Sequence, residues 1–145
     1  MLSVLVAIDF SESTHAIVEA AKQVTTDKAG QIVLLHVTAP DPEFVSYKPG
    51  PQHERDWRAE DIKKERAQID QLRDELQGQQ IEVKSLVVEG PTTDKIMEEV
   101  ERFSADMIVM GTHGHTAVYE ALVGSVTHAV LRRATVPVLL VPVHN

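Results

Sequence analysis

Five short apolar runs, separated by segments with helical periodicity, constrain the fold of this 145-residue chain most strongly. The runs are rich in β-branched residues, and most are continuously apolar, which is typical of parallel strands covered on both faces. The strand and helix patterns alternate as βαβαβαβαβ, which predicts an α/β fold: a doubly wound sandwich with right-handed crossovers. The predicted strands are residues 2–8, 32–37, 81–88, 107–110 and 136–143. The third alternates at first, which indicates an edge strand.

Capping residues, glycines and a proline bound the predicted helices. A capping cluster at residues 11–14 precedes the first helix, and Gly30 ends it. The second, residues 54–77, is highly charged, and we expect its charges to face solvent. Pro91 starts the third helix, and the fourth begins near Ser125. The narrow apolar stripe of the second helix comprises Ile62, Ile69, Leu72 and Leu76.

Length and composition indicate a single domain over residues 1–145. No apolar run approaches the roughly 18 residues of a membrane span, and the N-terminal segment lacks a basic region, so we expect a soluble, unexported, cytoplasmic protein. With no cysteine in the chain, disulfides, thiolate nucleophiles and cysteine-based metal sites are excluded.

The charge balance points away from nucleic acid and from anionic membranes as the main partner. Fourteen Lys and Arg stand against 22 Asp and Glu, a net charge of -8. The acidic excess lies before residue 104, because Asp106 and Glu120 are balanced by Arg132 and Arg133 in the remainder. An anionic ligand would therefore be least repelled by the C-terminal third.

Residues 40–53 form the one unusual segment, with four prolines and no periodicity. A connection of this length is either a functional lid or a mobile linker.

Ligands of open α/β sheets bind beyond the carboxyl ends of the strands, where the strand order reverses. The segment after the fourth strand has the parts of a phosphate site there. Gly111 and Gly114 allow a sharp turn and a close approach of backbone N–H groups to an anion. Gly124 and Ser125 open a helix whose N-terminus favours anions, and the Ser125 hydroxyl can cap that helix or bind a phosphate oxygen.

The histidines divide by position. His113 and His115 either contact phosphates or are exposed in their loop, and too few ligands lie nearby for a zinc site. His36 is expected to be a hydrogen-bonded core residue, and His15 and His128 to lie on helix surfaces.

Two enzyme motifs are missing from the sequence. There is no G-x-x-x-x-G-K-[ST] loop for phosphoryl transfer and no G-x-S-x-G nucleophile elbow. No catalytic residue is therefore assigned, and no metal ligand among the side chains, although magnesium could accompany phosphates.

The last strand, Val136 to Val143, is apolar on both faces and should lie at a sheet edge. An exposed edge of that kind invites aggregation unless it is covered. A two-fold partner pairing the same strand antiparallel would cover it, limited by Pro137 and Pro142 to the stretch between them.

The ordered pattern Gly111-x2-Gly114-x9-Gly124-Ser125 resembles the ATP-binding motif of the universal stress protein family. Other segments agree over nearly the whole chain: VLVAIDFSE, IVLLHV, ADMIVMGTHG and GSVTHAVLRRATVPVLLVPV. The resemblance implies a Rossmann-like fold with a five-stranded parallel sheet in the order 3-2-1-4-5. It also implies an ATP-type nucleotide between strands one and four, and a homodimer through the last strand.

The resemblance also implies individual roles. Ala7 and Asp9 match positions that face adenine and ribose, and the backbone of Val37 matches the position that reads the adenine edge. His115 replaces the usual basic residue after the second glycine, and Ala117 a common glycine. The ribose and phosphate positions match Gly111, Gly114, Gly124, Ser125 and Val126, with Met110 beside them.

We therefore expect an ATP-binding, homodimeric regulatory protein that binds nucleotide as a signal and does not turn it over. One alternative is a slow ATPase or adenylyl-transfer enzyme. Another is a dimeric interaction module with a vestigial site, favoured by His115 in place of a basic residue.

Overall fold

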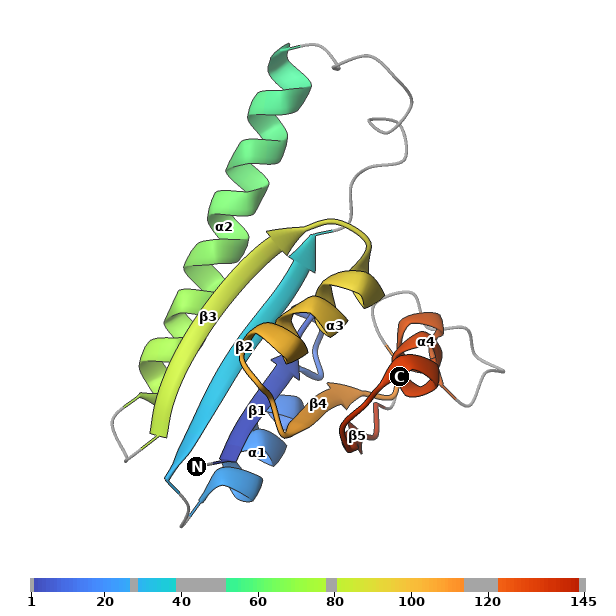
Figure 1. Ribbon diagram of the computed structural model, residues 1–145. Coiled ribbons are helices and arrows are strands. Elements are labelled where there is room, and N and C mark those ends of the chain that lie inside the picture. The colour runs from blue at the N-terminus through green and yellow to red at the C-terminus, as the bar shows by residue number, and fades with distance from the viewer. Residues whose placement is uncertain (1, 27–28, 39–51, 78–80, 114–122, 144–145) are drawn as a thin grey trace.

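The chain forms one five-stranded parallel sheet in the order β3-β2-β1-β4-β5 (Figure 1). The computed structural model describes residues 2–26, 29–38, 52–77, 81–113 and 123–143, without the side chains of residues 52–59. The predicted α/β sandwich and strand order are confirmed. The strands are β1 (Leu2–Ala7), β2 (Gly30–Thr38), β3 (Ile81–Glu89), β4 (Met107–Gly111) and β5 (Val138–Val141).

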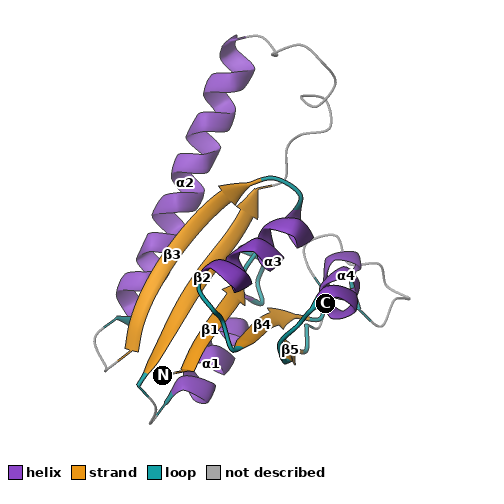
Figure 2. Cartoon of the chain, viewed as in Figure 1, coloured by secondary structure: helices purple, strands orange, loops and turns teal. Residues whose placement is uncertain are grey.

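Helices cover both faces of the sheet (Figure 2). One face carries α1 (Thr14–Thr25) and α2 (Gln52–Leu76), and the other carries α3 (Thr92–Arg102) and α4 (Ser125–Arg133). This arrangement is doubly wound, because the chain moves outward from β1 to β3 and then crosses to β4 and β5 on the other side.

The hydrophobic core consists of two layers, one on each side of the sheet. In β1, Val4 and Val6 face α1 and α2, whereas Leu5 faces α3 and α4. All three side chains are fully buried. The strands therefore have continuous apolar sequences because both of their faces are covered. The stripe predicted for α2 is part of this core, since Ile69 is buried and Leu72 packs against the same cluster.

The predicted end of the first helix is wrong. α1 ends at Thr25, and Gly30 is instead the first residue of β2. The Thr25 hydroxyl donates to the carbonyl oxygen of Ala21 at 2.9 Å, and the Thr26 N–H donates to Lys22 O at the same distance. These bonds close the last helical turn without a glycine.

Prolines set two further boundaries. Pro91 precedes α3 with an extended ψ of 125°, so that helix starts one residue later than predicted. β5 occupies only the four residues between Pro137 and Pro142, because proline has no N–H for the ladder. The turn into α3 requires Gly90, whose φ of 147° side-chain-bearing residues rarely adopt.

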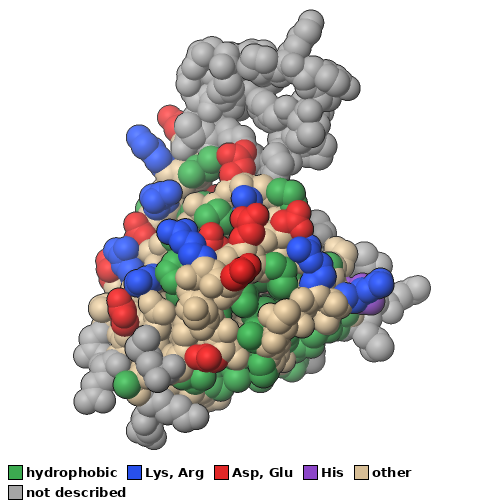
Figure 3. All heavy atoms as spheres, in the orientation of Figure 1, with side chains coloured by type: hydrophobic (Ala, Val, Ile, Leu, Met, Phe, Trp, Pro, Cys, Tyr) green, Lys and Arg blue, Asp and Glu red, His purple; other side chains and the backbone are tan. Residues whose placement is uncertain are grey.

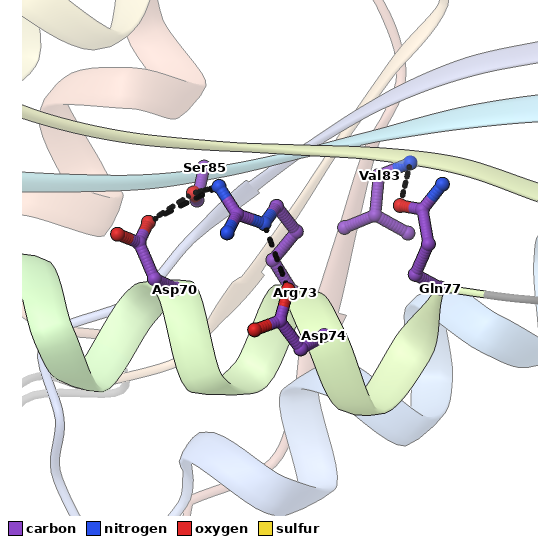
Figure 4. Close-up of polar contacts among 6 residues, drawn as sticks. All are labelled: Asp70, Arg73, Asp74, Gln77, Val83 and Ser85. Atoms are coloured by element: carbon purple, nitrogen blue, oxygen red, sulfur yellow. Dashed lines mark hydrogen bonds and ion pairs between the residues drawn. The ribbon is translucent and has the colours of Figure 1, made fainter.

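Polar side chains of α2, and of Gln77 just after it, contact β3 at the edge of the sheet (Figure 4). Gln77 Oε1 accepts a hydrogen bond from the Val83 N–H at 3.2 Å. Ser85 donates to Asp70 at 2.6 Å and accepts from Arg73 at 3.2 Å. The expectation of an edge position for this strand is confirmed, and its edge is occupied by side chains of the same chain.

Charges of both signs are interspersed on the face that carries α3 (Figure 3). One ion pair joins the two helices of that face, from Arg133 to Asp94 at 2.5 Å. Within the described residues, no helix is both long enough and apolar enough to cross a membrane.

Candidate functional site

A pocket of about 350 Å³ lies at the carboxyl ends of β1 and β4, the strands that flank the reversal of strand order. Ligands of doubly wound folds bind at this position. The volume is within the range of small-molecule sites. The lining residues are Ala7, Ile8, Asp9, Ile17, Leu35, Val37, Thr92, Ile96, Met110, Gly111, His113, Val126 and Thr127.

Asp9 follows β1 and presents the only carboxylate among the described lining residues. Its Oδ1 accepts the N–H of Ser11 at 3.0 Å, and the Ser11 hydroxyl accepts the N–H of Ser13 at 3.3 Å. Ser13 is the N-cap of α1 but makes no side-chain capping bond. The polar cluster at residues 11–14, predicted to cap the helix, instead shapes the turn that holds Asp9.

The ends of the connection from β4 to α4 are fastened by two threonines. Thr112 donates its N–H to Val141 O at 3.0 Å and accepts the Gly124 N–H on its carbonyl at 2.7 Å. The buried hydroxyl of Thr127 donates to Gly111 O at 2.9 Å. These bonds fix the first turn of α4 against the end of β4.

The N-terminus of α4 carries the donors of an anion site. The first intrahelical bond runs from the His128 N–H to Gly124 O, so the N–H groups of the preceding three residues have no acceptor within the helix. Gly124 has no side chain to cap them, and Ser125 is exposed and makes no capping bond. Val126 brings this turn to the pocket wall, where the helix dipole favours a negative group.

Gly111 has a different role from the one predicted. It is the last residue of β4, so it is extended and is not part of a sharp turn. A Cβ there would lie 2.9 Å from Cγ2 of Val143 and 3.2 Å from Cδ1 of Ile17. The missing side chain is therefore explained by packing of the C-terminal segment and α1 against the strand.

The opposite end of the pocket is apolar. It is lined by Leu35 and Val37 from β2 and by Ile96 from α3. Thr92, also on α3, adds one hydroxyl to these apolar side chains. Because β1 lies between β2 and β4, the pocket has apolar side chains on the β2 side, the Asp9 carboxylate after β1, and helix N–H donors on the β4 side. Such a combination suits a ligand with an aromatic ring, hydroxyl groups and an anionic tail.

Comparison with known proteins decides the family. The model of the universal stress protein family matches residues 1–142. The chain belongs to the universal stress protein family. Universal stress protein MJ0577 of Methanocaldococcus jannaschii is 28% identical over 98% of this chain and 95% of its own length. The solved structure of MJ0577 has a TM-score of 0.86 at 29% identity and covers 99% of this chain and 96% of that one.

Two further universal stress protein structures share the fold and were solved with nucleotides. One is in complex with cAMP, with a TM-score of 0.68, 20% identity, and coverage of 99% of this chain and 98% of that chain. The other, from Arabidopsis thaliana, has AMP bound, with a TM-score of 0.69, 18% identity, and coverage of 99% and 93%.

The structure brings most of the predicted site residues of this universal stress protein together around the pocket. Gly124 and Ser125 do not line the wall but form the start of α4 beside it. Gly114 and His115, with Ala117, lie outside the described residues, as does most of the segment 40–53. The lining residues that the sequence predicted are Ala7, Asp9, Val37, Met110, Gly111, His113 and Val126.

Sequence reasoning missed the threonines and the helix residues of the wall. Thr112 and Thr127 were not predicted, because glycines dominate the segment. A hydroxyl beside a glycine-rich turn is nevertheless a signal for a side chain that hydrogen-bonds to the backbone. Ile17 and Ile96 lie on the first helical turns that follow pocket-forming strands. Counting helical turns along the chain from Asp9 and from Gly90 could have identified Ile17 and Ile96 as residues that face the pocket.

The histidine predictions can be tested at four positions. His36 is buried and bonded to a backbone carbonyl, as predicted, and His15 and His128 are exposed on their helices. His113 lines the pocket, with Nδ1 3.1 Å from Thr112 Oγ1. Within the described part of the chain, no three His, Asp or Glu side chains gather as metal ligands.

A second hollow of about 330 Å³ lies on the other side of the β1–α1 turn, against α2. Its lining includes the carboxylates of Glu12 and Glu75 and no lysine or arginine. A phosphate group would be repelled there, so the glycine-bordered pocket is the better candidate for an anionic ligand.

Proposed function

We propose that this universal stress protein binds ATP as a regulatory signal in a cytoplasmic stress response and acts as a homodimer. Nucleotide in the pocket would change the segment 40–53 or the dimer surface, and a protein partner would recognise that change. Magnesium would arrive with the phosphates and would not need ligands from side chains.

The position of the pocket relative to α4 carries the proposal. Adenine fits the apolar side chains beside Val37, the ribose hydroxyls can donate to Asp9, and the phosphates would reach the N–H groups of Ser125 and Val126. A carboxylate is compatible with ATP because it lies between the base and the phosphates and not against the phosphates. The cAMP and AMP complexes of two structural neighbours support nucleotide binding.

Binding without turnover is favoured by the chemistry of the pocket wall. Among the described lining residues there is no lysine or arginine, which phosphoryl transfer usually employs near the transferred group. Asp9 already accepts a backbone hydrogen bond from Ser11. No residue is therefore assigned as a general base.

The two sheet edges support dimerisation through the segment from Val136 to Val143. At the outer edge of β3, the side chain of Gln77, just after α2, is bonded to the backbone of Val83. β5 forms the other edge, and all four of its residues are only half-buried. A second copy paired along β5 would bury these apolar side chains.

Denaturing the purified protein and separating the released material by chromatography tests the proposal. We expect ATP in the extract, and almost no ADP when the native protein is incubated with ATP for minutes. Turnover near 1 per second would instead indicate an enzyme.

Gly124→Val provides a matched variant. The φ of Gly124 is -71°, which any residue can adopt, so the variant should fold while its side chain blocks the start of α4. We expect it to release no ATP. If the wild-type protein also binds no nucleotide, the interaction module with a vestigial site becomes the better description.

A further inference from the structure

His36 holds the residues on both sides of Asp9. It lies in β2, is 8% exposed, and places Nδ1 2.8 Å from Ile8 O. Because a carbonyl oxygen only accepts, Nδ1 is the donor in this bond. The Ile8 N–H in turn donates to Leu35 O at 2.9 Å. Both backbone groups of the residue before Asp9 are therefore fixed by β2, one of them by a side chain.

The residue after Asp9 also contacts the His36 ring. Phe10 has a φ of 59°, in the left-handed region that side-chain-bearing residues rarely adopt. Its ring centroid lies 4.6 Å from that of His36, with 45° between the ring planes. A backbone conformation of this kind persists only where its surroundings hold it, and the imidazole is one of those contacts.

The other ring nitrogen of His36 faces α2. Nε2 lies 3.5 Å from Oε1 of Glu65, and Glu65 Oε2 accepts the hydroxyl of Thr38 at 2.6 Å. The Glu65 side chain is 25% exposed, so this pairing is partly shielded from solvent. A partner on the second nitrogen fixes the orientation of an imidazole.

We propose that His36 is a positioning residue of the nucleotide pocket. Held by Glu65 of α2, it fixes the turn at residues 8–10 and so aims the Asp9 carboxylate at the ribose hydroxyls. The inference rests on the proposed nucleotide-binding function and adds α2 to the site, although no α2 residue is among the described lining residues.

Two amide substitutions separate the contacts of His36. The amide nitrogen of asparagine branches from Cγ, as Nδ1 does, so His36→Asn can keep the bond to Ile8 and lose the one to Glu65. The glutamine amide lies one atom further out, nearer the position of Nε2, so His36→Gln gives up the bond to Ile8. We expect His36→Asn to bind ATP within threefold of the wild type, and His36→Gln about tenfold more weakly, the usual size of one lost hydrogen bond.

Comparison of ATP with 2′,3′-dideoxy-ATP distinguishes positioning of Asp9 from general damage. The wild type should prefer ATP, because the dideoxy compound has no hydroxyls for Asp9. His36→Gln should lose most of that preference and bind the dideoxy compound within twofold of the wild type. A merely structural role would weaken both ligands equally. His15→Gln, an exposed histidine on α1, is the control and should change neither affinity.

Glu65→Ala tests the same chain of contacts from a residue on the helix surface, where unfolding is not expected. It should lower the preference for ATP about threefold, whereas Asp61→Ala, exposed one turn earlier, should not change it.

If the wild type binds neither compound, the proposed function fails. If it binds ATP without preferring it, or if His36→Gln and Glu65→Ala both keep the preference, the positioning role is refuted and ATP binding stands. If His36→Gln does not fold, Glu65→Ala decides.

Discussion

At the scale of single residues, the two described glycines of the β4–α4 connection are glycine for different reasons. Gly111 is extended, and the space for its Cβ is occupied by Val143 and Ile17. Gly124 has a φ of -71°, which needs no glycine, and its missing side chain leaves the start of α4 open. Substitution at Gly111 should therefore affect stability, and substitution at Gly124 should affect ligand binding.

Gly111→Ala should lower the free energy of unfolding by about 1–3 kcal/mol, the usual cost of overpacking. Val143→Ala should recover much of that loss, because it removes the atom nearest to the added methyl group. Urea denaturation of both single variants and the double variant measures the coupling between the two sites. Equal destabilisation by Gly111→Ala in both backgrounds would show that the contact with Val143 is not the cause.

His115 carries a prediction about pH, because the resemblance to the family's motif implies that it replaces a basic residue. ATP affinity should rise as the pH falls from about 8 to 6, since the imidazole gains a proton over this range and the charged form attracts phosphate. His115→Arg should bind more tightly at pH 8 and lose most of the pH dependence. Because the titration of ATP itself contributes equally to both proteins, comparing the wild type with His115→Arg removes that contribution from the pH dependence.

His113→Gln is the control for that series, because His113 also lines the pocket. If this variant abolishes the pH dependence and His115→Arg does not, the effect belongs to His113. Equal wild-type affinity at pH 6 and 8 would show that neither imidazole couples to the phosphates.

At the scale of elements, one buried side-chain hydrogen bond holds the first turn of α4 at the pocket. The Thr127 hydroxyl donates to Gly111 O, and Thr127 is 3% exposed. The first turn of α4 carries the N–H donors proposed for phosphate. Its placement should therefore affect both stability and binding.

Thr127→Val should cost about 1–3 kcal/mol of stability, because the shape is kept while the carbonyl of Gly111 loses its partner. ATP affinity should fall with it. Thr93→Val on α3, which replaces a half-exposed threonine, is the matched control. Urea denaturation and calorimetry measure the two effects, and indistinguishable results for the two variants would contradict this role of Thr127.

The elements themselves were largely predictable because both faces of every strand except β3 are buried or half-buried, which leaves a strong apolar signal. The predicted boundaries of elements were wrong where a tertiary contact determines where the element ends. Nothing in the local pattern shows that Thr25 closes α1, or that Gly30 lies against the backbone of Leu2 in the sheet. The same holds for the site. Residues at strand ends were predictable from topology, whereas Thr92 and Thr127 reach the pocket only through the docking of their helices.

At the scale of the whole molecule, the two edges of the sheet differ. At the β3 edge, the side chain of Gln77 occupies the N–H of Val83, whereas β5 has no helix beyond it in the strand order. Pro137 O, just before β5, and Val141 O accept the N–H groups of Ile108 and Thr112, so these odd-numbered positions face β4. Because backbone groups alternate along a strand, Val138 and Leu140 direct theirs outward, where a second copy would pair.

Leu140→Pro should therefore convert the proposed dimer to a monomer, because it removes an outward N–H without removing a bond to β4. Sedimentation velocity measures the mass, and circular dichroism confirms that the sheet remains. Gln77→Ala at the opposite edge is the control and should leave the dimer intact. A folded Leu140→Pro variant with the mass of a dimer would place the interface elsewhere.

The central claim is that the pocket between β1 and β4 binds ATP, and isothermal titration calorimetry with magnesium at near-physiological salt tests it most directly. We predict a dissociation constant in the micromolar range or tighter, about -8 kcal/mol at 1 μM. Gly124→Val should give no heat under the same conditions. The absence of binding heat and of a thermal shift for the wild type at millimolar ATP would contradict the account.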